Sequence, residues 1–410
     1  MRTALRAVPV LLVVASLISL FAPRGAVTLP LYAARTGLLC ANCHFDPNGG
    51  GPRNDFGFMF ARQRHSLTPE DTTSKWASLD VVNRVGDRFP LYIGVNQRFM
   101  MLTTSTVEAD SLDRFGFYNM ENGIHLAFQP HQQLTLVYTR DGFDRGSTTQ
   151  DAWGMISGLP MNGYFRAGRF RNPFGLRMDD HTVATRNSFL DLQPFPGRFL
   201  PYDPRQPDMG FEVGANPGNM FGRVAFTNGG APNGAMPFGS QFAQAISAKF
   251  GMTHSWYQGQ ISFYDDFRDD ERHLLAGAER RATRWGYAGI GHWRNLAFLY
   301  EIAAGTDLVV GDIKRNSLAG FGELNYTPNR WSNYRVRFDY LELDRSNAFT
   351  DTGSPSLWRR YSVEGEFLPV PFGEIRWTYR LLQPNEEFYS FAPIEIPDER
   401  QVYVQLHFSY

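Results

Sequence analysis

Apolar and polar residues alternate with a period of two over most of the chain beyond about residue 88. The segment 334–341 reads YRVRFDYL, and 374–380 reads EIRWTYR. Such alternation is typical of β-strands that have one apolar and one polar face. A soluble sandwich would turn the apolar face inward, whereas a membrane barrel turns it toward lipid and lines a wet lumen with the charges.

The connections between these segments favour the membrane barrel. Short turns are predicted at 130–132, 216–219, 293–295, 328–330 and 369–372. Long polar stretches fall between them, at 141–150, 172–208, 265–281, 344–356 and 383–400. Short periplasmic turns that alternate with long outer loops are the outer-membrane pattern, and counting this way predicts about sixteen strands. Both ends of the barrel then lie on the periplasmic side.

The end of the chain carries a second barrel signal. The segment 402–410 reads VYVQLHFSY and finishes on the aromatic Tyr410. A terminal aromatic in such a strand resembles the recognition signal of outer-membrane barrels, which a soluble sandwich would not need. We therefore predict an all-β fold, a transmembrane antiparallel β-barrel over 85–410, surrounded by the lipid of the outer membrane of a Gram-negative-type bacterium.

Composition agrees with this fold and limits the partners. Aromatic residues make up 15% of the chain, which suits a barrel edged by aromatic girdles. The formal net charge of -1 argues against nucleic acid as a partner. The first residues predict a signal peptide over 1–26, because Arg2 and Arg6 precede an apolar stretch that is too short for a spanning helix. An uncleaved anchor is the alternative.

Residues 40–44 read CANCH, which is the C-x-x-C-H attachment motif of c-type haem. Cys40 and Cys43 would each bond one porphyrin vinyl group, and His44 would become the proximal iron ligand. The alternatives are a disulfide, a redox C-x-x-C pair, or half of a zinc site. A zinc site would need a second ligand pair, and a thioredoxin-like motif would need a βαβ context; neither is visible. We predict one covalent haem c in a small α-type cytochrome c module over 27–80.

The distal haem ligand is less defined by the sequence. Met59 and His65 are the near candidates, and His65 is preferred slightly. Methionine would raise the reduction potential and histidine would leave it lower. Met59 could instead be a core residue, His65 could lie in a solvated basic turn, and the sixth position could be open. A module this short cannot bury a large core, so we expect it to pack against or inside the barrel.

The N-terminal region resembles the fused cytochrome–porin family found in iron-oxidising bacteria. The match begins with YAARTG at 32–37 and the CANCH motif, and continues with Pro52, Asn54, Gly57 and Phe60, which echo the family's P-x-x-N-x-x-G-x-x-F run. An NGGG insert at 48–51 and a shorter proline-to-asparagine spacing depart from it. The segment 168–175, GRFRNPFG, also resembles a stretch of phosphate-type porins, which indicates a barrel and no particular substrate.

The resemblance implies an electron conduit. Such a protein would take electrons from an extracellular donor, Fe(II) being favoured, and pass them through one haem to a periplasmic carrier such as a soluble cytochrome. Direction is not encoded, so outward transfer to a mineral or oxyanion is an alternative. Two further alternatives are a diffusion porin with an attached haem module and a soluble secreted cytochrome. Possible Fe(II) oxidation is the only enzymatic activity suggested, because no other catalytic motif is present.

Two further segments carry groups that could bind cations. An acidic run begins at Asp265 and Asp266 and continues through 269–273, and a DDH triplet occupies 179–181. Hard carboxylates concentrate divalent cations. A solvated loop is the plainer interpretation of both, because neither shows the ligand spacing of a known metal motif.

Overall fold

The structure of the chain is a computed structural model. It describes residues 32, 36, 38, 40–69, 82–87, 90–106, 112–142, 148–176, 183–186, 207–229, 245–266, 281–309, 313–342, 345, 357–384 and 398–410. The predicted signal peptide over 1–26 lies outside these residues.

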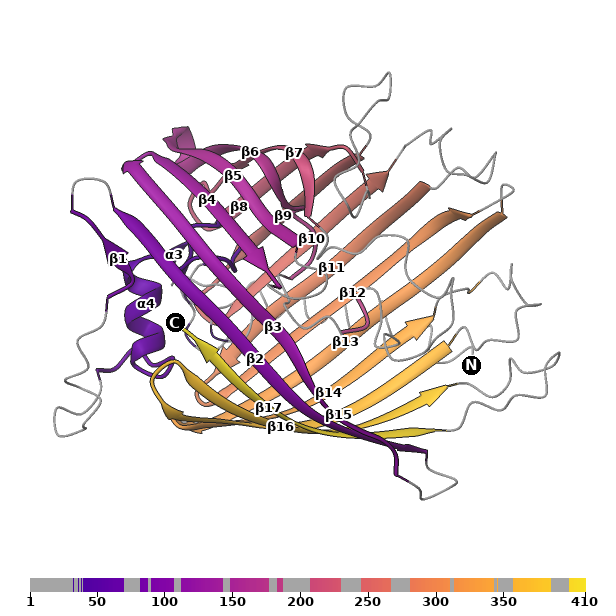
Figure 1. Cartoon of the computed structure of the whole chain (residues 1–410). Helices are drawn as coiled ribbons and strands as arrows, with labels where there is room; N and C mark the ends of the chain where they lie inside the picture. Colours follow the sequence, from indigo (N-terminus) through magenta and orange to yellow (C-terminus); the bar gives the residue numbers. More distant parts are fainter. Residues whose placement is uncertain are drawn as a thin grey trace.

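Sixteen antiparallel strands form a closed barrel over the described residues (Figure 1). They are β2 (Leu91–Thr106), β3 (Leu112–His131), β4 (Leu134–Asp141), β5 (Thr148–Leu159), β6 (Gly163–Arg171), β7 (Pro207–Ala215), β8 (Met220–Thr227), β9 (Ala245–Thr253), β10 (Tyr257–Asp266), β11 (Arg281–Trp293), β12 (Leu296–Val309), β13 (Ile313–Asn329), β14 (Ser332–Glu342), β15 (Leu357–Val370), β16 (Gly373–Pro384) and β17 (Glu399–Ser409). Each strand pairs with the next, and β17 pairs with β2 from Glu399↔Thr106 to Ser409↔Asn96, which closes the ring and removes both sheet edges.

The remaining elements are short and lie before or between these strands. Helices α3 (Cys40–Cys43) and α4 (Asp55–Arg62) precede the barrel, and the two-residue strand β1 (Arg84–Val85) pairs with the start of β2. A 3-10 turn, η2 (Pro160–Asn162), joins β5 to β6. None of the helices in the described part of the chain is long and apolar enough to cross a membrane.

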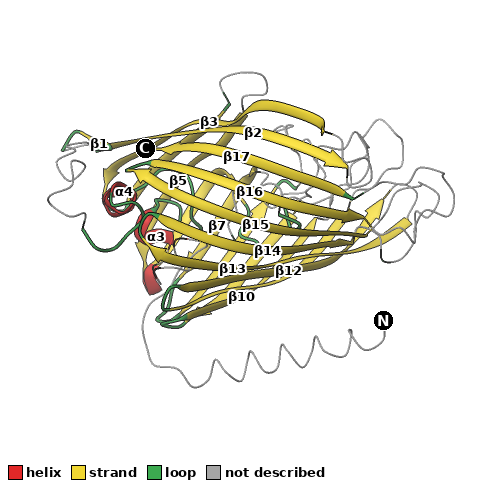
Figure 2. Ribbon diagram, turned by 90° about the horizontal axis from the view of Figure 1, so that it is seen from below, coloured by secondary structure: helices red, strands yellow, loops and turns green. Residues whose placement is uncertain are grey.

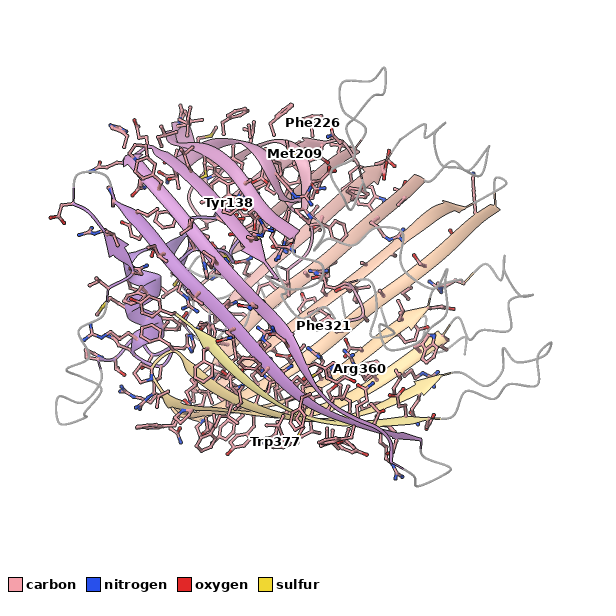
Figure 3. All side chains as sticks on the ribbon, in the orientation of Figure 1. Tyr138, Met209, Phe226, Phe321, Arg360 and Trp377 are labelled. Atoms are coloured by element: carbon pink, nitrogen blue, oxygen red, sulfur yellow. The ribbon has the colours of Figure 1, made fainter. Side chains whose placement is uncertain are left out.

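The strands turn their apolar side chains outward. On β14, Val336 is 50% exposed, whereas the neighbouring Arg337 is only 4% exposed. On β16, Trp377 lies on the outer face (Figure 3), while the alternate residues Thr378 and Arg380 are buried. This is the arrangement of a membrane barrel, in which lipid meets the apolar face and the lumen holds the polar one. The predicted fold class is therefore confirmed.

Turn and loop lengths alternate along the barrel as the sequence predicts. Five of the short connections fall where they were expected, for example between Ala215 and Met220 and between Val370 and Gly373. Two other short connections were not predicted: η2, and residues 254–256 between β9 and β10. These seven short connections lie at the end of the barrel that also holds α3, α4 and the C-terminus (Figure 2), whereas most connections at the other end are longer, apart from the three residues between β12 and β13. This identifies the end with the seven turns as the periplasmic one.

Residues 172–176 and 183–186, the described parts of the connection after β6 and here called the inward loop, lie in the lumen and pack on the wall formed by β11 to β13. Leu176 and Val183 are buried against Ile290, Leu299 and Phe321 from β11 to β13. The backbone N–H of Leu176 donates to Glu301 Oε2 at 2.7 Å, and Arg186 forms an ion pair with Glu301 at 2.7 Å. The inward loop narrows the barrel interior.

Gly175 lets the inward loop approach this carboxylate. Its φ is +55°, and a Cβ at this position would lie 2.3 Å from Glu301 Oε1. A larger residue would be strained at this φ and would displace the Glu301 carboxylate from its contacts with the loop. Gly175 closes the 168–175 segment, which the sequence linked only to barrels in general.

Candidate functional site

The C-x-x-C-H motif lies on α3 and on the residue after it, packed closely against α4. The contact is made through Gly57, where a Cβ would lie 2.0 Å from the Cys43 carbonyl oxygen. Asn54 caps α4 by accepting from the Gly57 N–H at 2.9 Å, and its own N–H donates to the Cys43 carbonyl at 3.0 Å. Asn54 and Gly57, which match the asparagine and glycine of the P-x-x-N-x-x-G-x-x-F run, thus form the contact between α3 and α4.

The two thiols have the state that a haem attachment site needs. Cys40 and Cys43 lie on one helical turn and do not form a disulfide. Burial raises the pKa of the Cys43 thiol to about 11; the neighbouring Cys40 adds to the rise and Arg53 opposes it. Cys43 is therefore held as a neutral thiol near neutral pH.

The glycines of the NGGG insert shape the partner of His44. Gly49, Gly50 and Gly51 all have positive φ, which bends the chain back toward the motif. His44 Nδ1 lies 3.3 Å from the Gly51 carbonyl oxygen. Because a carbonyl only accepts, Nδ1 carries the proton, and Nε2 is the nitrogen with a lone pair for a metal. Sequence reasoning gave the insert no role, because the contact depends on a backbone carbonyl.

This donor set fits a c-type haem. Two unbridged thiols two residues apart and an imidazole fixed in the Nε2-ligating tautomer are the groups that would hold it, namely Cys40, Cys43 and His44.

The two candidate distal ligands lie in different surroundings. Met59 is 42% exposed, and it lies about 200° around α4 from Gly57, away from the Cys43 contact. His65 follows the end of α4 with φ +55° and stacks on Tyr32 with ring centroids 3.8 Å apart. It also contacts Phe60, which is one turn from Gly57 on the same side of α4. His65 thus packs against Tyr32 and Phe60, whereas Met59 is largely exposed.

The loop after His44 is anchored in the lumen by a buried ion-pair cluster. Arg166 of β6 lies 3.0 Å from Asp46 Oδ2 and 2.8 Å from Glu212 Oε2 of β7. Asn48 donates to Glu212 at 3.2 Å, and Tyr164 also donates to this carboxylate. We call Asp46, Asn48, Arg166 and Glu212 the lumen anchor; Arg166 and Glu212 are fully buried.

The same N-terminal segment also contacts the opposite side of the barrel. Arg53 donates to the Ser409 carbonyl at 2.7 Å, and Phe58 stacks on Phe372 and packs edge-on against Tyr410. The Arg64 guanidinium lies 3.5 Å from the Trp331 ring centroid. These contacts involve β14 to β17 and their turns, and β15 is eight strands from β7 in a ring of sixteen. Residues 40–69 therefore bridge the periplasmic mouth from wall to wall (Figures 1 and 2).

The acidic segments do not form a site in the described part of the chain. Asp265 accepts from Thr283 at 2.7 Å, and Asp266 accepts from Tyr264 at 3.3 Å. The rest of that run and the 179–181 triplet lie outside the described residues. Among the residues that are described, no group of three histidine, cysteine or acidic side chains could hold a metal ion.

Comparison with solved structures places the barrel among porins. The anion-selective porin from Comamonas acidovorans superposes with a TM-score of 0.57 at 7% identity, over 78% of this chain and all of that one. The channel DcaP of Acinetobacter baumannii gives 0.58 at 8%, over 78% and 97%. Salmonella typhi OmpF gives 0.55 at 12%, over 80% and 100%. No protein-family model and no curated protein matches the chain.

At these identities the likeness defines the fold alone. The protein is a porin-like β-barrel of the outer membrane, in contact with lipid through its apolar outer face. This confirms the predicted location. The predicted haem and the assignment to the fused cytochrome–porin family stay predictions.

Proposed function

We propose that this protein is an outer-membrane electron conduit of the fused cytochrome–porin type. It carries one haem c on Cys40, Cys43 and His44 and takes electrons from an extracellular donor, Fe(II) being favoured, for delivery to a periplasmic carrier such as a soluble cytochrome. One observation carries the proposal: the C-x-x-C-H segment lies within the mouth of the barrel, attached to both walls. A module hung below an open pore would not need these contacts.

The barrel and the N-terminal segment have separate roles in this proposal. The closed ring of strands encloses a polar lumen that crosses the lipid layer. The lipid layer itself does not conduct electrons. The lumen anchor and the Arg53 contact hold the segment in that lumen. The bound haem would supply a one-electron redox centre whose potential the protein sets through axial ligation and burial.

His65 is the distal ligand that this proposal favours. It packs against Phe60, which lies one turn from the α3 contact at Gly57, and the Tyr32 ring stacks on its imidazole. Met59 lies on the other side of the helix and is largely exposed. Replacement of His65 by Met should raise the haem reduction potential, whereas replacement of Met59 by Leu should leave it unchanged.

A direct test uses intact cells that display the protein. Fe(II) is added outside while the haem absorbance is recorded, with dithionite as the positive control. The conduit proposal expects Fe(II) to reduce the haem, and a variant with Cys40→Ala and Cys43→Ala to show no such signal. A haem that stays oxidised under Fe(II) but is reduced by dithionite would rule out iron oxidation.

A diffusion porin is the second candidate, and the fold comparisons favour it. It would require an open aqueous path past residues 40–69 and past the inward loop. Single-channel conductance in a planar bilayer separates the two functions. The conduit proposal expects far lower conductance than that of a general porin of the same strand number, whereas steady porin-like conductance would favour the diffusion porin.

A further inference from the structure

Two cations lie side by side on the lumen wall next to the C-x-x-C-H segment. Arg223 of β8 and Lys249 of β9 are direct partners in the strand register. Arg223 is 8% exposed and Lys249 only 2% exposed. Like charges opposite each other destabilise a strand pair, and a buried ammonium is costly unless an anion compensates it.

The carboxylates of this region are already engaged by another residue. Arg166 forms ion pairs with Asp46 at 3.0 Å and with Glu212 at 2.8 Å. Arg223 donates only to neutral groups, the Pro47 carbonyl at 3.2 Å and Asn216 Oδ1 at 3.5 Å. Within the described ranges, neither Arg223 nor Lys249 has a carboxylate oxygen inside the 4.0 Å ion-pairing distance. Three cations thus face two carboxylates.

This cation pair faces the proposed haem-binding segment. Pro47, which accepts from Arg223, lies three residues after His44. Lys249 lies close enough to Cys40, Asp46 and Glu212 for electrostatic interaction with them. An anion that filled the positive site would therefore lie beside the attachment cysteines.

We propose that Arg223 and Lys249 bind a propionate carboxylate of the haem attached at Cys40 and Cys43. The inference rests on the proposed function, because it needs the haem. A propionate is a carboxylate carried by the group itself, so its arrival would supply a carboxylate in direct contact with the pair, and arginine and lysine are the usual partners of carboxylates. The barrel wall would then bind the cofactor directly.

The test is a redox titration of the purified, haem-loaded protein. Lys249→Met removes the ammonium and keeps an unbranched side chain. A cation beside a haem favours the ferrous state, so the variant should hold about tenfold less ferrous haem at a fixed potential, a midpoint lower by about 59 mV. Lys249→Arg should restore the wild-type midpoint. Lys314→Met, the same change at an exposed site on β13, is the matched control and should not shift it.

The outcomes separate this inference from the proposed function. Wild-type protein without covalent haem overturns both. Haem-loaded wild type, with Lys249→Met at the wild-type midpoint, overturns only the propionate site. If Lys249→Met fails to give the heat-modifiable band of a folded barrel, Arg223→Met takes its place and is judged by the same shift. A shift of equal size in Lys314→Met would also overturn the inference.

Discussion

At the scale of single residues, Gly57 is where α4 packs against the backbone of the C-x-x-C-H segment without room for a side chain. A side chain there would collide with the Cys43 backbone, which cannot move without disturbing α3. Overpacking of this kind costs about 1–3 kcal/mol. We predict that Gly57→Ala lowers the covalent haem per folded barrel, measured by haem staining against the heat-modifiable band.

The control for Gly57→Ala is Gly322→Ala on β13, because nothing lies within 4 Å of a Cβ at that position. It should leave both the haem stain and the barrel band at wild-type levels. Equal haem loading in the two variants would show that the close α3–α4 contact is not needed for attachment.

The second prediction at this scale concerns the Cys43 thiol in haem-free protein. Burial, the largest cause of its raised pKa of about 11, keeps the thiolate scarce near neutral pH. A Cys40→Ala background removes the smaller contribution of Cys40 and keeps the burial, so the rate of alkylation by iodoacetamide should still rise with pH well beyond about pH 8.5. An ordinary thiol would level off above about pH 8.5. Levelling near pH 8.5 would mean that Cys43 is solvated.

At the scale of elements, the sequence predicted what depends on local pattern. The strands were visible because lipid and lumen impose a strict two-residue alternation, as on β14 and β16. The turn at η2 was not predicted, although residues 158–163 read GLPMNG and so contain a proline and two glycines. Its two residues with positive φ are Met161 and Asn162. The 254–256 turn, in contrast, contains neither glycine nor proline.

The contacts between elements could not be predicted in the same way. The motif residues Cys40, Cys43 and His44 were found from spacing alone, whereas the lumen anchor joins residues 46–48 to strands more than a hundred residues later. Arg166 and Glu212 look like any other lumen residues in sequence. Only the fold shows that they meet Asp46 and Asn48.

At this scale, the lumen anchor should hold the N-terminal segment in the mouth of the barrel. Arg166→Met removes the cation that pairs with both Asp46 and Glu212, and loss of one partner from a buried ion pair typically costs about 3–5 kcal/mol. We predict that the variant releases the N-terminal segment from the mouth. The measurements are faster trypsin cleavage within residues 40–69 and new conductance in a planar bilayer.

Arg360→Met is the matched control for this prediction. Arg360 is also a buried lumen arginine, paired with Asp339 at 2.8 Å, but its ion pair lies on β14 and β15 and does not involve the N-terminal segment. It should not expose residues 40–69 to trypsin. The same cleavage rate in Arg166→Met and wild type would show that other contacts hold the segment.

At the scale of the whole molecule, two segments of the chain lie inside the barrel at different depths. The N-terminal segment spans its periplasmic mouth, and the inward loop is fixed to the far wall through Glu301. A general diffusion porin needs a continuous aqueous path, whereas an electron conduit needs an insulating ring around a redox group. The wall-to-wall contacts of residues 40–69 favour the second arrangement.

The most direct test of this account is whether the mature chain in the outer membrane carries covalent haem. The protein is produced in a host that matures c-type cytochromes, and outer-membrane fractions are denatured and stained for haem peroxidase activity. The account predicts a haem band that stays with the chain and disappears in a variant with Cys40→Ala and Cys43→Ala. A folded barrel in that membrane with no bound porphyrin would contradict it.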